Sequence, residues 1–252
     1  MKKMLAVSAM LFAASAMAQP PMDKYNKSCA VCHNAGVAGA AKTGDVEAWA
    51  PQLGFAHTAG AAVPFVKGDA AAGESLTAVC AACHGADGNS QSPTFPKIAG
   101  LGERYLYKQL LDIRDGARPI PTMAGQVDNM TNQQLADIAA FYAAKPISGS
   151  QADPDLVALG EKVYRAGVAE RKVAACIGCH SPNGKGNAPA GYPALAGQHP
   201  EYIATQLRQY RKGYEDPDGR TNDGDTRIMR SNAFGLSDME IEAVASYAAG
   251  LR

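Results

Sequence analysis

Hydrophobic residues recur at three- and four-residue intervals in two separate segments of the chain, which is the spacing of a helix with one buried face. The positions are Leu135, Ile138, Ala139 and Tyr142 in one segment and Ile241, Val244, Ala245 and Ala248 in the other. Each segment begins with a hydroxyl residue and has Gln134 or Glu240 three positions later. This order predicts helices that start at capping boxes on Thr131 and Ser237.

Two further amphipathic segments predict helices over Glu103 to Arg114 and Glu201 to Lys212. A first helix is expected to run into each of two cysteine-containing motifs farther upstream. No convincing strand alternation is present, so the predicted fold class is all-α.

These elements belong to an internal repeat. Residues 95–100 recur as residues 192–197, and Tyr105, Gln109 and Arg114 recur as Tyr202, Gln206 and Arg211. The repeat predicts two homologous lobes, over residues 68–147 and 154–252, with a linker at 148–153 that contains Ser, Gly and Asp. Residues 19–67 form a shorter third segment that leads into the first lobe.

Residues 1–18 have the pattern of an export signal. Lys2 and Lys3 precede a short apolar stretch, and Ala16-Met17-Ala18 resembles a cleavage site. Loss of the two lysines lowers the basic count from 24 to 22 against 24 acidic residues, which gives no case for nucleic acid binding. No later stretch has the roughly 20 apolar residues of a transmembrane helix.

All six cysteines lie in three C-x-x-C-H motifs, which is the spacing of c-type haem attachment. Two thiols one helical turn apart can each form a thioether with the haem, and the adjacent histidine ligates the iron. The three motifs therefore predict three covalently attached haem c groups. Their residues are Cys29, Cys32 and His33, then Cys80, Cys83 and His84, then Cys176, Cys179 and His180.

Disulfides, a redox dithiol and a zinc site are the alternative interpretations of these cysteines. None of them requires a histidine directly after the second cysteine, and here that histidine occurs three times. The haem interpretation is favoured for this reason.

The second axial ligand decides between electron transfer and ligand binding at each iron. Met123 and Met229 occupy matching positions in the two lobes, in predicted loops between the last two helices. A single methionine would more simply pack in the core, but two at matched positions favour iron ligation. The first segment has no methionine between His33 and Met123, and its candidate ligand is His57.

The acidic stretch from Glu215 to Asp225 has no counterpart in the first lobe. It is expected to be a solvated insertion. It lacks the ligand spacing of a calcium-binding EF-hand loop.

Residues 68–252 closely resemble the dihaem cytochrome c4 family. The resemblance lies in the two later attachment motifs with their flanking glycines, in Leu195 to His199, and in Arg220 to Arg230. It implies two class I cytochrome c lobes facing each other in a pseudo-twofold arrangement, each with His/Met ligation. It also implies a periplasmic carrier that passes electrons from a quinol–cytochrome c oxidoreductase toward a haem-copper terminal oxidase.

Residues 25–53 resemble the start of a cytochrome c5 domain, without the methionine loop and closing helix of that family. The function expected from these observations is electron transfer rather than catalysis, with peripheral membrane association left open. The alternative is a multihaem peroxidase or small-molecule reductase with an open site at the first haem.

Overall fold

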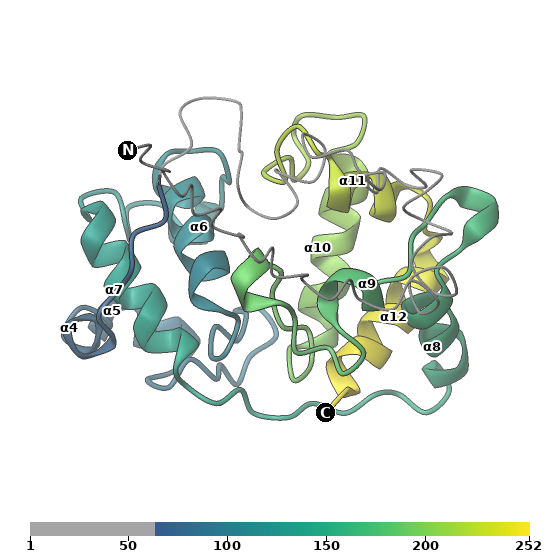
Figure 1. Ribbon diagram of the computed structural model, residues 1–252, viewed down its shortest axis with the longest axis horizontal. Coiled ribbons are helices and arrows are strands. Elements are labelled where there is room, and N and C mark those ends of the chain that lie inside the picture. Colours follow the sequence, from purple (N-terminus) through teal and green to yellow (C-terminus); the bar gives the residue numbers. More distant parts are fainter. Residues whose placement is uncertain (1–63) are drawn as a thin grey trace, which may run out of the picture.

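The computed structural model describes residues 64–252, and they form two helical lobes joined by an extended segment (Figure 1). Within this range there is no strand, and the β-type pairing consists of two isolated bridges, Val168 with Val173 and Asn187 with Tyr192. The predicted all-α class is confirmed. The predicted export signal and the first C-x-x-C-H motif, with Cys29, Cys32, His33 and the candidate ligand His57, lie outside the described residues.

The first lobe surrounds the face of α7 that carries Leu135, Ile138 and Tyr142, and Leu106, Tyr107 and other α6 side chains pack against this face. Its helices are α4 (Ala70–Glu74), α5 (Ala78–His84), α6 (Glu103–Arg114), the 3-10 turn η2 (Pro121–Met123) and α7 (Asn132–Ala143).

The second lobe repeats this arrangement around α12, whose Ile241, Val244 and Ala248 are buried. Its elements are α8 (Val157–Ala166), η3 (Ala169–Arg171), α9 (Ile177–His180), η4 (Ala188–Ala190), α10 (Pro200–Lys212), α11 (Ile228–Phe234) and α12 (Asp238–Gly250). In Figure 1, α6 and α10 lie toward the middle of the molecule, between the two cores.

Both predicted capping boxes are present. The Thr131 hydroxyl accepts from the Gln134 amide and the Ser237 hydroxyl from the Glu240 amide, while the Gln134 and Glu240 side chains bind back to the cap backbone. The sequence therefore determines where α7 and α12 start.

The prediction that one continuous helix runs into each attachment motif is wrong. In the first lobe the helix is broken, because α4 ends at Glu74 and α5 begins at Ala78. In the second lobe α8 ends at Ala166, and a loop closed by the Val168–Val173 bridge separates it from α9. The attachment motif therefore sits on a short helix of its own in each lobe.

A row of polar contacts joins the lobes. The Lys97 amide donates to the Gln198 side-chain oxygen (2.9 Å), and the Gln198 side-chain amide donates back to the Lys97 carbonyl (2.7 Å). The buried Lys97 ammonium donates to the Gly197 carbonyl (2.8 Å), and His199 Nε2 donates to the Ser90 carbonyl (3.1 Å). These bonds hold the two attachment regions in a fixed relation.

Candidate functional site

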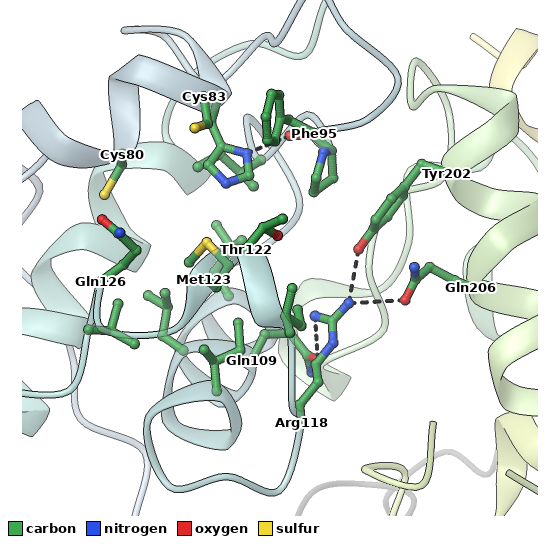
Figure 2. Close-up of a pocket in the computed structure, with 18 of the residues that line it drawn as sticks. Cys80, Cys83, Phe95, Gln109, Arg118, Thr122, Met123, Gln126, Tyr202 and Gln206 are labelled. Atoms are coloured by element: carbon green, nitrogen blue, oxygen red, sulfur yellow. Dashed lines mark hydrogen bonds between the residues drawn. The ribbon is translucent and has the colours of Figure 1, made fainter. Parts of the chain in front are cut away.

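The first lobe contains a cavity of about 700 Å³ whose walls are mostly apolar. Cys80, Cys83 and His84 from α5 line it, and Met123 from η2 lines it as well. Figure 2 shows the two thiols and the Met123 thioether around this one space. The structure thus brings together in one cavity the four residues that the sequence assigned to one haem.

Each attachment histidine is held by a matching hydrogen bond. His84 Nδ1 lies 2.8 Å from the Pro96 carbonyl, and His180 Nδ1 lies 2.9 Å from the Pro193 carbonyl. A carbonyl only accepts, so the proton resides on Nδ1 and the lone pair on Nε2. Burial lowers the pKa of both histidines, which favours the neutral form that binds a metal.

The four thiols in the described part of the chain, on Cys80, Cys83, Cys176 and Cys179, are free of disulfides. Burial raises the pKa of Cys176 to about 12 and also raises that of Cys80. In residues 64–252 no cluster of three or more His, Cys, Asp or Glu side chains could hold a bare metal ion. The geometry therefore favours neither the disulfide nor the zinc interpretation.

The two predicted methionine ligands lie on different kinds of element. Met123 ends the 3-10 turn η2, whereas Met229 lies in helix α11 and not in the predicted loop. Helix α11 contacts the segment that leads into the second attachment motif. The amide of Ala174, two residues before Cys176, donates to the side-chain oxygen of Asn232 in α11 (2.9 Å).

A buried polar cluster beside the cavity joins the two lobes, and sequence reasoning missed its central members. Arg118 donates to Gln109 of its own lobe (3.0 Å) and to Gln206 of the other lobe (3.0 Å). Arg220 donates to Gln206 of its own lobe (2.7 Å) and to Gln109 of the other lobe (2.8 Å). The pattern is pseudo-symmetric, and Figure 2 shows Arg118 reaching Tyr202 and Gln206 across the interface.

This cluster carries unbalanced positive charge. Arg118 and Arg220 are each only 8% exposed, and among the described residues neither guanidinium forms an ion pair with a carboxylate. Gln109 Oε1 accepts from both arginines and from Asn222 as well. Burial acts to raise the pKa of Tyr105, but the charges of Arg220 and Arg118 outweigh it and lower that pKa.

Buried charges normally have a partner of opposite sign. Arg118 and Arg220 both line the cavity that holds the thiols. A haem has an apolar ring, two thioether attachment points and two carboxylate side chains. The apolar walls, the paired thiols and the two unpaired guanidiniums therefore fit this group.

Two lobes with this helix order, each with an attachment motif on a short helix, define the cytochrome c fold. The family model described as cytochrome c matches residues 70–143 and 157–251. The chain belongs to the cytochrome c4 family, whose relatives cover both lobes.

Cytochrome c4 of Pseudomonas aeruginosa is 52% identical over 198 residues, which span 79% of this chain and 92% of that protein. The crystal structure of reduced recombinant cytochrome c4 from Pseudomonas stutzeri has a TM-score of 0.70 at 49% identity, and it covers 73% of this chain and 100% of that one. A thiosulfate dehydrogenase electron acceptor of Stutzerimonas stutzeri is 35% identical over 68% of this chain and 78% of its own length.

The protein is therefore an electron-transfer cytochrome of the haem c type. In the part of the chain from residue 64 onward, no helix is long and apolar enough to cross a membrane.

Proposed function

We propose that this protein is a periplasmic carrier with three covalently attached haems, which passes electrons from a quinol-oxidising complex toward a haem-copper terminal oxidase. The observation that carries the proposal is the shared cavity of Cys80, Cys83, His84 and Met123, together with its counterpart motif in the second lobe. The export signal at residues 1–18 supports the periplasmic location.

In the first lobe, Cys80 and Cys83 would hold the haem, with His84 and Met123 as axial ligands. In the second lobe, Cys176 and Cys179 would hold it, with His180 and Met229. When bound, haem supplies a one-electron ferrous/ferric couple, and a methionine ligand raises its potential.

The residues around each proposed haem would orient its ligands, exclude water and set its reduction potential. Pro96 and Pro193 fix the imidazole orientation through their carbonyls. Apolar residues around the cavity exclude water. Arg118 and Arg220 would bind the acidic side chains of the haems and favour the reduced state, which carries one positive charge fewer.

Cys29, Cys32 and His33 would attach a third haem in the segment before the first lobe, with His57 as the candidate sixth ligand. An open sixth position at this haem is the one route to the alternative function, a peroxidase or a small-molecule reductase. Carbon monoxide binding to the fully reduced protein separates the two, because an iron with both axial positions filled binds it poorly. Stoichiometric binding at one haem per chain would favour the enzyme.

Substitution of the axial methionines tests the proposed ligation. Met123→Ala and Met229→Ala should each abolish the methionine-to-iron absorption of one haem and lower its potential by roughly 100 mV or more, since axial ligands and their surroundings set haem potentials over about 0.8 V. Met239→Ala, which changes an exposed methionine of α12, is the matched control. Unchanged spectra in both ligand variants would overturn the proposal.

The similarity to a thiosulfate dehydrogenase electron acceptor favours a second candidate role, in which the electron donor is a thiosulfate dehydrogenase. Stopped-flow reduction of the oxidised protein by a quinol-oxidising complex and by a thiosulfate-oxidising enzyme would rank the two donors. The proposal requires the faster reduction to come from the quinol-oxidising complex.

A further inference from the structure

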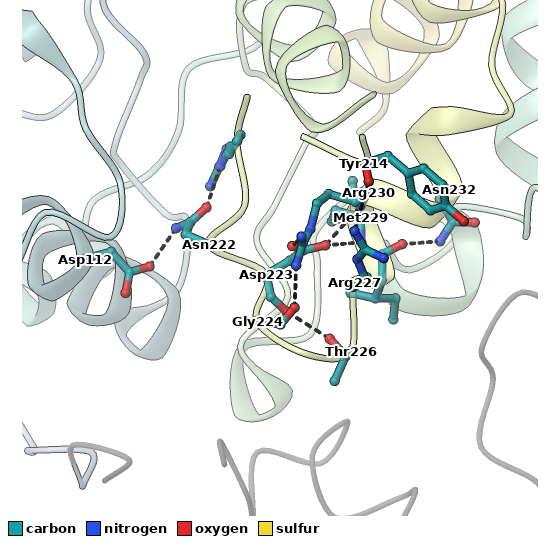
Figure 3. Close-up of polar contacts among 12 residues, drawn as sticks. Asp112, Tyr214, Asn222, Asp223, Gly224, Thr226, Arg227, Met229, Arg230 and Asn232 are labelled. Atoms are coloured by element: carbon teal, nitrogen blue, oxygen red, sulfur yellow. Dashed lines mark hydrogen bonds and ion pairs between the residues drawn. The ribbon is translucent and has the colours of Figure 1, made fainter. Parts of the chain in front are cut away.

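One carboxylate, that of Asp223, accepts hydrogen bonds from the start of the helix that carries Met229. Asp223 Oδ2 accepts from the backbone amides of Met229 (3.0 Å) and Arg230 (2.9 Å). Its other oxygen, Oδ1, accepts from Arg230 Nε (2.6 Å), and the same guanidinium donates to the Gly224 carbonyl (2.5 Å). Figure 3 shows Asp223 at the centre of these contacts.

This ion pair is buried. The Asp223 side chain is 4% exposed and that of Arg230 is 11% exposed. A charge-assisted hydrogen bond in such a site is stronger than one at the surface, and loss of either partner leaves the other charge unpaired. Helix α11 spans only Ile228–Phe234, and short helices depend on tertiary contacts for their stability.

The first lobe has no equivalent fastening. The Met123 amide donates to the backbone carbonyl of Ile120 (2.8 Å), and the sequence from Pro119 to Met123 contains no acidic residue. The two methionines therefore occupy matched positions in the repeat, but side-chain charge restrains only the segment of Met229.

The residue next to Asp223 is held by the first lobe. The Asn222 side chain donates to Gln109 (2.9 Å) and Asp112 (2.6 Å) of α6, and the Lys108 ammonium donates to the Asn222 carbonyl (2.6 Å). Figure 3 shows the contact between Asn222 and Asp112. Helix α6 of the first lobe thus fixes the backbone that presents Asp223 to α11.

We propose that Asp223 is a positioning residue for the iron of the second lobe. It holds the Met229 thioether at the haem, and Asn222 transmits the position of α6 to this contact. The inference rests on the proposed assignment of Met229 as axial ligand. Its consequence is that the contacts of Asn222 with α6 stabilise the methionine ligation of the second haem.

The test compares variants of the full haem-loaded chain. Asp223→Ala should lose the methionine-to-iron absorption of one haem per chain, lower the potential of that haem and open it to carbon monoxide. The haem of the first lobe should keep its spectrum, which also reports that the first lobe is folded. Asp225→Asn, at an exposed acid of the same loop, is the matched control and should leave both haems unchanged.

A milder variant guards against collapse of the second lobe. Asp223→Asn keeps one acceptor but loses the charge that faces Arg230. The imidazole concentration that displaces half of the Met229 ligand should fall about tenfold, as expected for loss of a charge-assisted hydrogen bond. Asn222→Ala should lower the same concentration in the second haem and leave the first unaltered.

Met229→Ala distinguishes failure of the ligand assignment from failure of the positioning role. If this variant leaves all spectra unchanged, the ligand assignment itself fails. If it removes one methionine signal while Asp223→Ala and Asp223→Asn behave like the native protein, the positioning role is refuted and the ligand assignment stands.

Discussion

Arg118 and Arg220 link the two lobes beside the cavity of the first lobe. Each guanidinium binds one glutamine of its own lobe and one of the other, and both face the cavity that holds the thiols. A positive charge near an iron disfavours its oxidised state, because oxidation adds a positive charge.

Removal of one such charge should lower the haem potentials. A unit charge taken at about 10 Å in an effective dielectric of about 20 contributes roughly 1–2 kcal/mol, which is on the order of 50–100 mV for a one-electron couple. Arg118→Met should shift the potentials downward by this order in a redox titration. Arg104→Met, at an exposed arginine of α6 that stacks on Phe65, should shift them little. Equal shifts in both variants would contradict the assigned role.

His199 gives the lobe interface a pH dependence. Burial, followed by the charge of Lys97, lowers its pKa, although the Ser90 carbonyl and Glu201 act in the other direction. In the unfolded chain His199 therefore binds a proton below about pH 6.5. In the folded protein it binds that proton only at a lower pH. The stability contributed by neutral His199 is present above pH 6.5 and is lost as the pH falls below it.

Melting temperatures measured between pH 7.5 and 5 test this linkage. The native protein should lose more stability over this range than His199→Gln, which keeps a side-chain donor toward Ser90 but does not titrate. Parallel pH profiles for the two proteins would show that His199 is not the group responsible.

Among the helices, the tightest contact is the crossing of the first helix of each lobe over the last. A methyl group added at Gly73 would lie 2.1 Å from the Asp137 carbonyl oxygen of α7, and one at Gly160 would lie 2.2 Å from the Ala243 carbonyl oxygen of α12. Both lobes therefore require glycine where these helices meet.

Gly160→Ala should destabilise the second lobe by about 1–3 kcal/mol or more, which is the usual cost of overpacking against a backbone that cannot yield. Chemical denaturation followed by helix content measures this change. Gly178→Ala is the control, since nothing lies within 4 Å of that position and the first lobe already has Ala82 there. Similar losses in the two variants would refute the packing argument.

The sequence predicted those elements that depend on local pattern. Helices α6, α7 and α12 follow from amphipathic spacing and capping boxes, and the attachment motifs follow from covalent chemistry. The helical position of Met229 was not predictable, because α11 depends on Asp223 and on long-range contacts rather than on its own seven residues.

The acidic stretch from Glu215 to Asp225 also depends on long-range contacts that local pattern does not predict. Glu215 and Asp218 are exposed as expected, but Asn222 is buried and Asp223 lies in a buried ion pair. The correspondence between Arg118 and Arg220 in the internal repeat was also not predicted. Arg118 comes two positions after Gly116, whereas Arg220 comes seven positions after Gly213, so the insertion breaks the alignment of the repeat. Matching the two lobes with a gap at this point would have revealed it.

For the whole molecule, the proposed first haem adds a third redox centre to a two-lobed cytochrome c4. The double substitution Cys29→Ser and Cys32→Ser should lower the intact mass of the matured chain by one haem and leave the two described lobes loaded. Their melting temperature and methionine absorption should not change, because the cores of the two lobes are formed within residues 64–252. An unaltered haem count would contradict the third attachment site.

Both lobes are expected to hold an iron that is ligated by a histidine on one side and a methionine on the other. Proton nuclear magnetic resonance of the fully reduced protein tests it most directly, since the haem ring current displaces a coordinated methionine methyl far upfield of all other signals. Two such three-proton signals are expected per chain, one lost in Met123→Ala and the other in Met229→Ala. One signal or none in the native protein would contradict it.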